Sequence, residues 1–494
     1  MSIPAIRPDL ATATRLLRAS DVVPLVLDLP AGEATPVSLM QRLGVEGHCF
    51  LLESATPPGG MHGYSFLGHD PVEVARSDEV DPLGPLAAVL HETVAPVEGL
   101  DSPFVGGWVG HLGYEAAAAY ERLPATTPAF AAVPVASFAL YRTLTVFDHA
   151  RSRILLVTQL ARGGDVDAAY HAACERLAGL HRRITLAPAG RPGAVDNPGA
   201  VAVPTPVAGH RTLSKRVLPD AASTFPRQRF LAAVARALDH IVAGDIFQVQ
   251  VSRRFSVELT AHPFTLYTAL RQSSPTPYLF YVNSPACTIV GASPEMLVRV
   301  RGDEIEYRPI AGTRRRGYDA AEDAAMEAEL HSSEKEQAEH LMLVDLGRND
   351  VGRVAVTGSV EVHESAVIER YSRVMHLVSG IRARLRPDCS ALDAMRACFP
   401  AGTVTGAPKI RAMEIIADLE PYGRGPYAGA VGYIGSGSAL DTAITLRTIV
   451  VIDGRAHLQA AAGIVADSNP DEEAREIDNK IAAALDADAR VHGW

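Results

Sequence analysis

The stretch of sequence that decides the fold is GAVGYIGSGSALDTAITLRTIVVIDGRAHLQAAAGIVAD, residues 429–467. Its runs GAVGYIG, ALDTAITLRTIVVID and RAHLQAAAGIVAD predict three strands. Asp453-Gly454 joins the last two, and a tight Asp-Gly between apolar runs is a strong hairpin signal. We therefore expect antiparallel neighbours in this part of the chain.

The segments before this stretch extend the same pattern. IFQVQVSRRF, residues 246–255, predicts a strand. CTIVGASPEMLVRVRGDEIEYRPIAG, residues 287–312, predicts a meander with Gly302-Asp303 as one turn. Antiparallel meanders with helices set apart indicate an α+β protein rather than a doubly wound parallel sheet.

The clearest break in the chain lies between Thr185 and Thr224. This segment carries six prolines and four glycines with little apolar periodicity, which is linker composition. We expect an N-terminal region at 1–184, a linker at 185–222 and a C-terminal core at 223–494.

The segments on either side of the break predict regular structure. FALYRTLTVFD and RILLVTQL, residues 138–148 and 153–160, read as strands. After the break, Ser223 can cap a helix that begins near Pro226 and ends at Gly244.

Composition excludes several classes of protein. The 494 residues are 47% hydrophobic and 21% charged, as in an ordinary globular protein. No run approaches the roughly 20 apolar residues that span a bilayer, and the N-terminus lacks a signal core. Five scattered cysteines without a CxxC pair predict a reduced cytoplasmic protein. A formal net charge of -11 argues against a nucleic-acid partner.

Two pairs of glutamates suggest a metal site. Glu336 and Glu339 lie in SSEKEQAEHLMLVDLGRND, and Glu473 and Glu476 lie in SNPDEEAREIDNKIAAAL. Positions i and i+3 share a helix face, so each pair projects two carboxylates the same way. Facing carboxylates fit a hard divalent cation, most naturally Mg²⁺. The alternative is two solvated helix starts that favour the macrodipole.

Local signals place both glutamate pairs at helix starts. Ser333 with Glu336 fits a capping box, and Asn469 can cap the second helix with Pro470 at its first position. Lys480 follows Glu476 by four residues and could form a simple salt bridge or hold a substrate carboxylate beside the metal.

A third candidate, AGTVTGAPKIRAMEII, resembles a phosphate loop only superficially. Gly402, Gly406 and Lys409 fail the P-loop spacing because Ala407-Pro408 intervene. Pro408 suits the first turn of a helix whose free N–H groups could bind a carboxylate, and a plain helix start is equally compatible.

The remaining candidates are isolated polar residues. The arginines of RPIAGTRRRG could form a solvated loop or steer an anion. Glu295 lies at a turn between two strands, as a solvated side chain or a general acid. His376 has an apolar setting typical of a core histidine. Arg447, flanked by apolar residues, needs an anionic partner if it is buried.

Taken in order, these segments resemble the chorismate-utilising enzyme family, and within it the anthranilate synthase component I group. The resemblance covers most of residues 223–494. It implies large antiparallel β-sheets packed as a sandwich with helices on the outside, and a Mg²⁺ enzyme acting on chorismate. The matching blocks are GDIFQVQVSRRF, GASPEMLVRV, RPIAGTRRRG, EKEQAEHLMLVDLGRNDVGRV, GTVTGAPKIRAMEII, YAGAVGYIG, ITLRTIVV and AGIVADSNPDEEAREIDNK.

The resemblance also implies roles for individual residues. Glu339 and Glu476 match the metal ligands, and Glu336 and Glu473 match their supporting pair. Glu295 matches the proposed general acid for the departing ring 4-hydroxyl. The residues implied in contact with the substrate are Lys480 and Gly463 near the ring carboxylate, Tyr427 and Arg447 on the enolpyruvyl carboxylate, and His376, Thr403, Ala311, Gly312 and Thr313.

Two positions bear on the nucleophile. Gln248 falls where the water-using isochorismate and salicylate synthases carry a lysine base, and Ala311 falls where aminodeoxychorismate synthases carry a lysine. The resemblance thus implies that ammonia attacks ring carbon 2, giving 2-amino-2-deoxyisochorismate and then, with loss of pyruvate, anthranilate. A synthase that stops at the intermediate is the alternative. No Gly-x-Cys-x-Gly loop occurs, so a separate glutamine amidotransferase subunit is expected to supply ammonia.

The N-terminal region carries a possible regulatory element. FLLES, residues 50–54, resembles the element that binds tryptophan as feedback inhibitor, with Pro277 and Tyr278 on the other side of the pocket. Leu52, Glu53 and Ser54 are the implied contacts. Gly63 departs from the family, which often has arginine there. Two rival functions are a nucleotide-binding protein built on GTVTGAPK and a non-catalytic amino-acid sensor.

Overall fold

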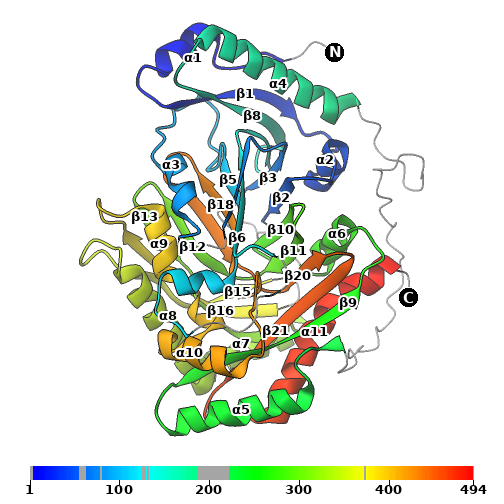
Figure 1. Ribbon diagram of the computed structural model, residues 1–494, viewed down its shortest axis with the longest axis vertical. Helices are drawn as coiled ribbons and strands as arrows, with labels where there is room; N and C mark the ends of the chain where they lie inside the picture. Colours follow the sequence, from blue (N-terminus) through cyan, green and yellow to red (C-terminus); the bar gives the residue numbers. More distant parts are fainter. Residues whose placement is uncertain are drawn as a thin grey trace.

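The computed structural model describes residues 4–54, 63–77, 81–124, 130, 133–186, 222–274, 276–371 and 374–492. The predicted linker lies outside these residues, apart from 185, 186 and 222. Two large sheets built from antiparallel neighbours form the centre of the molecule, with helices around them (Figure 1). The predicted α+β sandwich with helices on the outside is therefore confirmed.

The first sheet has eleven strands and runs through both halves of the sequence. β2 of the N-terminal region pairs directly with β10, so the first 184 residues share a sheet with the core. In spatial order its strands are β1 (Val22–Pro30), β8 (Arg153–Ala161), β7 (Thr143–Asp148), β3 (Tyr64–His69), β2 (Cys49–Glu53), β10 (Tyr278–Asn283), β11 (Thr288–Ser293), β20 (Thr448–Ile452), β21 (Arg455–Ile464), β9 (Gln248–Glu258) and β17 (Gly406–Ala407).

The second sheet has ten strands, and its buried apolar side chains, like those of the first sheet and of the helices, belong to two core clusters. β5 pairs with β18, which again joins the N-terminal region to the core. Its strands are, in order, β14 (Ile310–Arg315), β16 (Val374–Arg384), β13 (Glu304–Tyr307), β12 (Met296–Arg301), β19 (Ala439–Ile444), β18 (Ala430–Gly435), β5 (Gly107–Leu112), β6 (Ala136–Tyr141) and β4 (Glu73–Ser77), with β15 (Glu361–Arg370) paired to β16.

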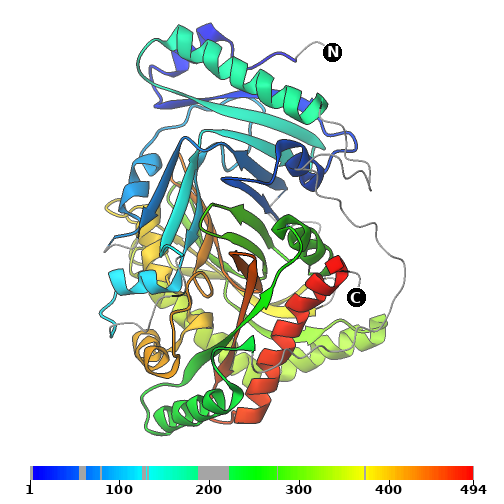
Figure 2. The ribbon, with the colours of Figure 1, turned by 45° about the vertical axis from the view of Figure 1, so that its right-hand side comes forward.

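The helices lie outside the sheets (Figure 2). α11 packs against β21 and α6, and α8 packs against β14 and β16. None of the described helices is both long and apolar enough to cross a membrane. The helices are α1 (Leu10–Leu16), α2 (Pro36–Leu43), α3 (Ala87–Leu90), α4 (Val166–Leu186), α5 (Arg227–Val242), α6 (Pro263–Ser273), α7 (Ala320–Ser332), α8 (Glu334–Gly352), α9 (Ala391–Cys398), α10 (Lys409–Leu419) and α11 (Pro470–His492), with short 3₁₀ turns η1 (Gly84–Leu86), η2 (Tyr114–Ala119) and η4 (Gly402–Val404).

Both predicted two-residue turns are confirmed. Ile452 pairs with Arg455, and the intervening Asp453 and Gly454 have φ of 47° and 70°. Positive φ at both central residues is the type I′ geometry whose twist matches that of the strands. Gly302-Asp303 joins β12 to β13 between the paired residues Arg301 and Glu304, and here only Gly302 has a positive φ, 61°.

Three predicted segments cross between the sheets where continuous structure was expected. The run 439–453 is two strands, β19 and β20, in different sheets, and 138–148 divides likewise into β6 and β7. The predicted meander leaves the first sheet after β11, and β16 lies between β13 and β14. A strand buried on both faces is apolar throughout, so its residue pattern does not indicate which sheet it joins.

The helix after the linker begins without the predicted cap. Pro226 is the N-cap residue of α5. The Ser223 hydroxyl instead closes a turn, accepting from the N–H of Phe225 at 3.1 Å. Gly244, with φ of 80°, ends the helix as predicted.

Candidate active site

The glutamate pairs lie at the starts of α8 and α11. Ser333 caps α8, accepting from the N–H of Glu336 at 3.4 Å. The reciprocal half of the predicted capping box is replaced, because the Glu336 carboxylate accepts from Arg314 Nη1 at 2.9 Å. Asn469 caps α11 as predicted, accepting from the N–H of Asp471 at 3.0 Å.

The two helices bring their carboxylates into one electrostatic site. Burial raises the pKa of Glu339, and the like charges of Glu336 and Glu476 raise this pKa further. Burial also raises the pKa of Glu473, with Glu476 adding to the effect. Gln248 Nε2 donates to Glu339 Oε1 at 3.2 Å, which partly offsets the cost of burying that carboxylate. The four acids therefore interact electrostatically across the two helices, with Lys335 acting in the opposite sense on Glu339 and Glu473.

This donor set fits a Mg²⁺ ion. Its oxygens are hard ligands, and a divalent cation relieves the like-charge repulsion that raises these pKa values. Among the described residues, no group of three or more His, Cys, Asp and Glu side chains is arranged to hold a metal ion by itself. Mg²⁺ is commonly held by one or two carboxylates and completes its shell with water and substrate oxygens. Glu339 and Glu476 would supply those two carboxylates.

Lys480 and Gly463 border the glutamates. Lys480 Nζ forms an ion pair with Glu476 Oε1 at 2.6 Å and donates to the carbonyl of Ala461 at 2.9 Å. A Cβ added to Gly463 would lie 2.8 Å from Gln250 Nε2 and 3.0 Å from Gln248 Nε2, so a side chain there would have to displace these amides. Tyr427 is buried in the loop before β18, and its hydroxyl also lies near the backbone of Ala461.

Glu295 lies inside the protein, at the crossover from β11 to β12. It is 5% exposed, and burial raises its pKa to about 8. The Thr403 hydroxyl lies close enough to lower this pKa slightly. Neither Glu295 Oε1 nor Thr403 Oγ1 completes a hydrogen bond within the described residues. At neutral pH Glu295 is thus a protonated acid with an unused oxygen, which excludes the solvated alternative.

β14 connects this acid to the glutamates. The backbone of Ile310 faces Glu295, and two residues later Gly312 lies against Glu336. Gly312 has φ of 59° within a bulge between Ala311 and Thr313. A Cβ there would lie 2.7 Å from Leu330 Cδ1 and 3.1 Å from Glu336 Oε2, so the close packing requires glycine.

His376 of β16 lies opposite Thr313 of β14, and its imidazole is neutral. Its Nδ1 lies 3.0 Å from Thr313 Oγ1 and 3.3 Å from the carbonyl of Gly312. Burial, reinforced by the charge of Arg447, lowers the pKa of His376 to about 4. The neutral ring can therefore exchange hydrogen bonds with a substrate but carries no charge at pH 7.

Arg447 lies at the crossover from β19 to β20, with φ of 48°. Its side chain reaches solvent, yet the protein around it lowers its pKa through desolvation. Among the described residues it forms no ion pair, so the anionic partner predicted for a buried arginine is not supplied by them. A solvent-reaching, desolvated guanidinium is suited to an anionic ligand.

The other arginines near β14 form ion pairs within the protein. They bind carboxylates of α7, α8 and β15, so the predicted alternative of anion steering is not supported. The pairs are Arg308 with Glu364 and Glu369, Arg314 with Glu329 and Glu336, Arg315 with Glu322, and Arg316 with Asp323.

The segment 401–416 is not a phosphate loop. Thr403 lies in η4, and Pro408 is the N-cap residue of α10. The Lys409 ammonium is buried against Asp350 Oδ2 at 2.6 Å, so it is not available to a phosphate. The geometry therefore supports the plain helix start and removes the basis of the nucleotide-binding hypothesis.

A second recess lies away from the glutamates and contains all five predicted inhibitor contacts. It encloses about 540 Å³ outside the protein atoms, open solvent included. Leu52, Glu53, Ser54, Pro277 and Tyr278 all line it. Gly63 packs toward Ala150 and is not among the lining residues. The other lining residues are Tyr64, Phe66, Pro103, Leu279, Phe280, Val431, Gly432, Tyr433, Asp441 and Ala443.

Sequence reasoning missed the polar floor of this recess. Tyr278 donates its hydroxyl to Asp441 Oδ1 at 2.9 Å and accepts from Arg299 Nη2 at 3.0 Å. Arg299 also pairs with Asp441 and Glu306, both at 2.9 Å. The one available signal was a single acid in the apolar run ALDTAITL. Arg299 thus connects two residues that line the recess, Tyr278 and Asp441, to Glu306 of β13.

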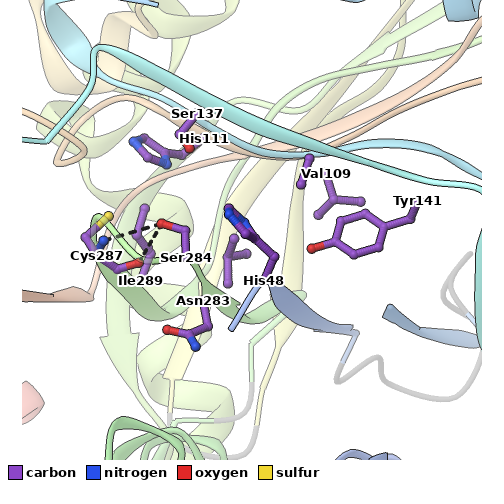
Figure 3. Close-up of a pocket in the computed structure, with 11 residues that line it drawn as sticks. His48, Val109, His111, Ser137, Tyr141, Asn283, Ser284, Cys287 and Ile289 are labelled. Carbon is purple, nitrogen blue, oxygen red and sulfur yellow. Dashed lines mark hydrogen bonds between the residues drawn. The ribbon is translucent and has the colours of Figure 1, made fainter. Parts of the chain in front are cut away.

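A third, smaller recess lies between the β5–β6 pair and the β10–β11 hairpin (Figure 3). His48, His111 and Cys287 line it, and His111 Nε2 has no hydrogen-bond partner within the described residues. Burial lowers the pKa of His111 to about 4 and raises that of Cys287 to about 12, so both are neutral at pH 7. No predicted site residue lies here.

Comparison with known proteins agrees with this geometry. The model of a family described as chorismate binding enzyme matches residues 47–486. A protein of Streptomyces coelicolor named anthranilate synthase component 1 is 46% identical over 98% of this chain and 92% of its own length. The crystal structure of anthranilate synthase component I from Streptococcus pneumoniae superposes with a TM-score of 0.70 at 34% identity, covering 87% of this chain and 93% of that one.

A more distant structure shares the fold alone. The menaquinone-specific isochorismate synthase of Escherichia coli superposes with a TM-score of 0.69 at 18% identity, over 97% of this chain and 98% of that one.

Proposed function

Because this chain belongs to the family of chorismate binding enzymes, we propose that it is an anthranilate synthase component I, which converts chorismate and ammonia into anthranilate and pyruvate with Mg²⁺. The observation that carries the proposal is Glu295, a buried acid that stays protonated at pH 7 and is joined by β14 to a site of converging carboxylates.

The chemistry requires both parts of the site. The ring 4-hydroxyl leaves only when it is protonated or bound to a Lewis acid. Glu295 donates the proton from its carboxyl oxygen. Mg²⁺, held by Glu339 and Glu476, would bind the ring carboxylate and act as the Lewis acid. In a protein of net charge -11, Arg447 and Lys480 provide the local positive charge that a dianionic substrate needs.

The choice of nucleophile depends on two positions where other members of the family carry a lysine and this chain does not. The Gln248 amide is neutral, and it donates to Glu339 rather than activating water. Ala311 ends in a methyl group and is buried on β14. We therefore infer attack by ammonia at ring carbon 2. The relatives' name, component 1, implies a second component, and we propose a glutamine amidotransferase subunit as the source of ammonia.

The product of the reaction is the direct test. Purified protein incubated with chorismate, Mg²⁺ and a high concentration of ammonium is expected to form fluorescent anthranilate and one equivalent of pyruvate. Omitting ammonium or Mg²⁺ is the control and should stop product formation. Accumulation of the non-aromatic 2-amino-2-deoxyisochorismate would support the alternative enzyme instead, and absence of any turnover would contradict the proposal.

We also propose that the recess beside FLLES binds tryptophan as a feedback inhibitor. Its walls include the aromatic rings of Tyr64, Phe66 and Tyr433, which suit an indole. Its floor carries Asp441, whose carboxylate suits an ammonium group. We further propose that this enzyme serves the biosynthesis of tryptophan in the cytoplasm, whose reducing environment is in keeping with its five free cysteines.

Filling the recess is expected to relieve inhibition. Ala443 is 1% exposed and lines the recess, so Ala443→Leu adds three carbons to the space an indole would occupy. We expect the tryptophan concentration for half-inhibition to rise at least about tenfold, equivalent to about 1.4 kcal/mol of lost binding. The measurement is turnover against tryptophan concentration, normalised to each variant's uninhibited rate. Ala439→Leu, on the same strand but outside the recess, is the control, and equal inhibition of both variants would disprove the assignment.

A further inference from the structure

A buried arginine, Arg424, connects two parts of the candidate site from behind. It follows α10 and is 2% exposed. Its Nε and Nη2 donate to the two carboxylate oxygens of Glu420 at 2.9 and 2.7 Å. This bidentate pair gives the planar guanidinium one fixed orientation.

The other guanidinium contacts reach two catalytic segments. Nη1 donates to the carbonyl of Val404 at 2.6 Å, and Val404 directly follows Thr403. Nη2 also donates to the carbonyl of Gln250 at 2.8 Å. Gln250 lies two residues after Gln248 on β9, and Gln248 holds Glu339. One planar group thus sets the spacing between the turn that carries Thr403 and the strand that carries Gln248.

The backbone of this arginine is itself held in place. The Glu115 carboxylate, from the N-terminal region, accepts from the N–H groups of Arg424 and Gly425 at 2.5 and 2.9 Å. Glu420 is held in turn by the N–H and hydroxyl of Ser252 at 2.8 and 2.9 Å. Both the backbone of Arg424 and the carboxylate that binds its guanidinium are therefore fixed by hydrogen bonds.

We propose that Arg424 is a positioning residue of the chorismate reaction, which holds Thr403 beside Glu295 and Gln248 beside Glu339. The inference rests on the proposed function of the site. Lysine cannot replace it, because an ammonium group is a point charge on a flexible stem and lacks the planar fork that reaches several acceptors at once.

Displacement of Thr403 has a specific consequence for the acid. The Thr403 hydroxyl lowers the pKa of Glu295, and the backbone of Ile310 does the same. Among the described residues, the titratable side chain found to interact with Glu295 is Tyr307 of β13, and burial raises the pKa of Tyr307, so it stays neutral. When Thr403 moves away, the pKa of Glu295 rises and the basic limb of the pH–rate profile moves to higher pH. A general loss of folded protein would not move that limb.

The test compares two arginines that each bind both oxygens of one carboxylate. Arg424→Lys is expected to lower kcat about 10- to 100-fold with a smaller change in KM, the effect of displacing reacting groups by about 1 Å, and to move the basic limb upward. Arg142→Lys is the control. Arg142 donates to both carboxylate oxygens of Glu92 at 2.6 and 2.7 Å and to Gln159 at 2.7 Å, so it forms the same kind of planar pair in the N-terminal region, away from the residues of the site. It should lose stability but keep kcat and the pH profile.

A second variant guards against failure to fold. Glu420→Gln keeps the shape of the acid but weakens its hold on Arg424, so it should show the same two changes at smaller size, and it decides the question if Arg424→Lys is insoluble. Wild-type kcat and an unmoved basic limb in the soluble variants would overturn the positioning role. Wild-type protein without turnover of chorismate would instead refute the proposed function.

Discussion

Glu295→Gln is expected to reduce the turnover of chorismate by about 10²- to 10⁴-fold, the usual contribution of a general acid. Glutamine has the same shape but no acidic proton, so the ring 4-hydroxyl would leave as hydroxide. KM should change much less than kcat, because the acid acts in the transition state. Steady-state kinetics at saturating ammonium and Mg²⁺ measure both. Glu295→Asp, which keeps the acid but withdraws it by one methylene, should retain part of the activity.

The pH dependence follows from the same group. Burial raises the pKa of Glu295 to about 8, so turnover should fall as pH rises through 8 and the acid loses its proton. The residual activity of Glu295→Gln should lack this basic limb. A wild-type profile with the same limb in the glutamine variant would assign the limb to another group.

Stability should depend on pH with a matching sign. The pKa of Glu295 is about 8 in the folded protein and about 4.5 in the unfolded chain. Its contribution to the free energy of unfolding is therefore fully present below pH 4.5 and is lost as pH rises toward 8. Glu295→Gln does not titrate, so its Tm relative to wild type should increase between pH 5 and pH 9. A Tm difference between variant and wild type that stays constant across that range would contradict a buried, titrating acid.

Local features of this fold could be predicted from the sequence. The Asp453-Gly454 hairpin, the caps at Ser333 and Asn469 and the shared face of each glutamate pair depend on residues within about one turn of each other. Their geometry follows from backbone preferences and helix periodicity. Spacing alone, however, favoured a solvated helix start over a metal site for either glutamate pair.

Features set by distant segments could not be predicted. Glu295 and Arg447 both lie where the chain crosses between sheets, and nothing in the flanking apolar runs marks a crossover. The ion pairs of the arginines in RPIAGTRRRG could not be predicted because their partners belong to α7, α8 and β15. Arg424 was missed altogether, since a lone arginine in YGRGPYAG gives no sign of burial.

Glu339→Gln is expected to have the second large effect, at least about 100-fold on kcat/KM at limiting Mg²⁺, in line with losing a metal-binding carboxylate. The substitution preserves volume, and its amide oxygen can still accept from Gln248 Nε2 as Glu339 Oε1 does. The loss would thus report on charge rather than on packing. Activity should be partly recovered at high Mg²⁺, so the concentration for half-maximal activity is the quantity to measure.

Without metal, the same variant should be at least as stable as wild type. Glu336 and Glu476 repel the Glu339 carboxylate, and the neutral amide removes this repulsion. A gain in Tm combined with lost activity is what distinguishes a ligand from a structural side chain, because most destabilising changes lower both. Glu334→Gln is the matched control, since Glu334 lies on the same helix with an exposed side chain. Equal Mg²⁺ dependence in the Glu339 and Glu334 variants would show that the converging carboxylates do not hold the ion.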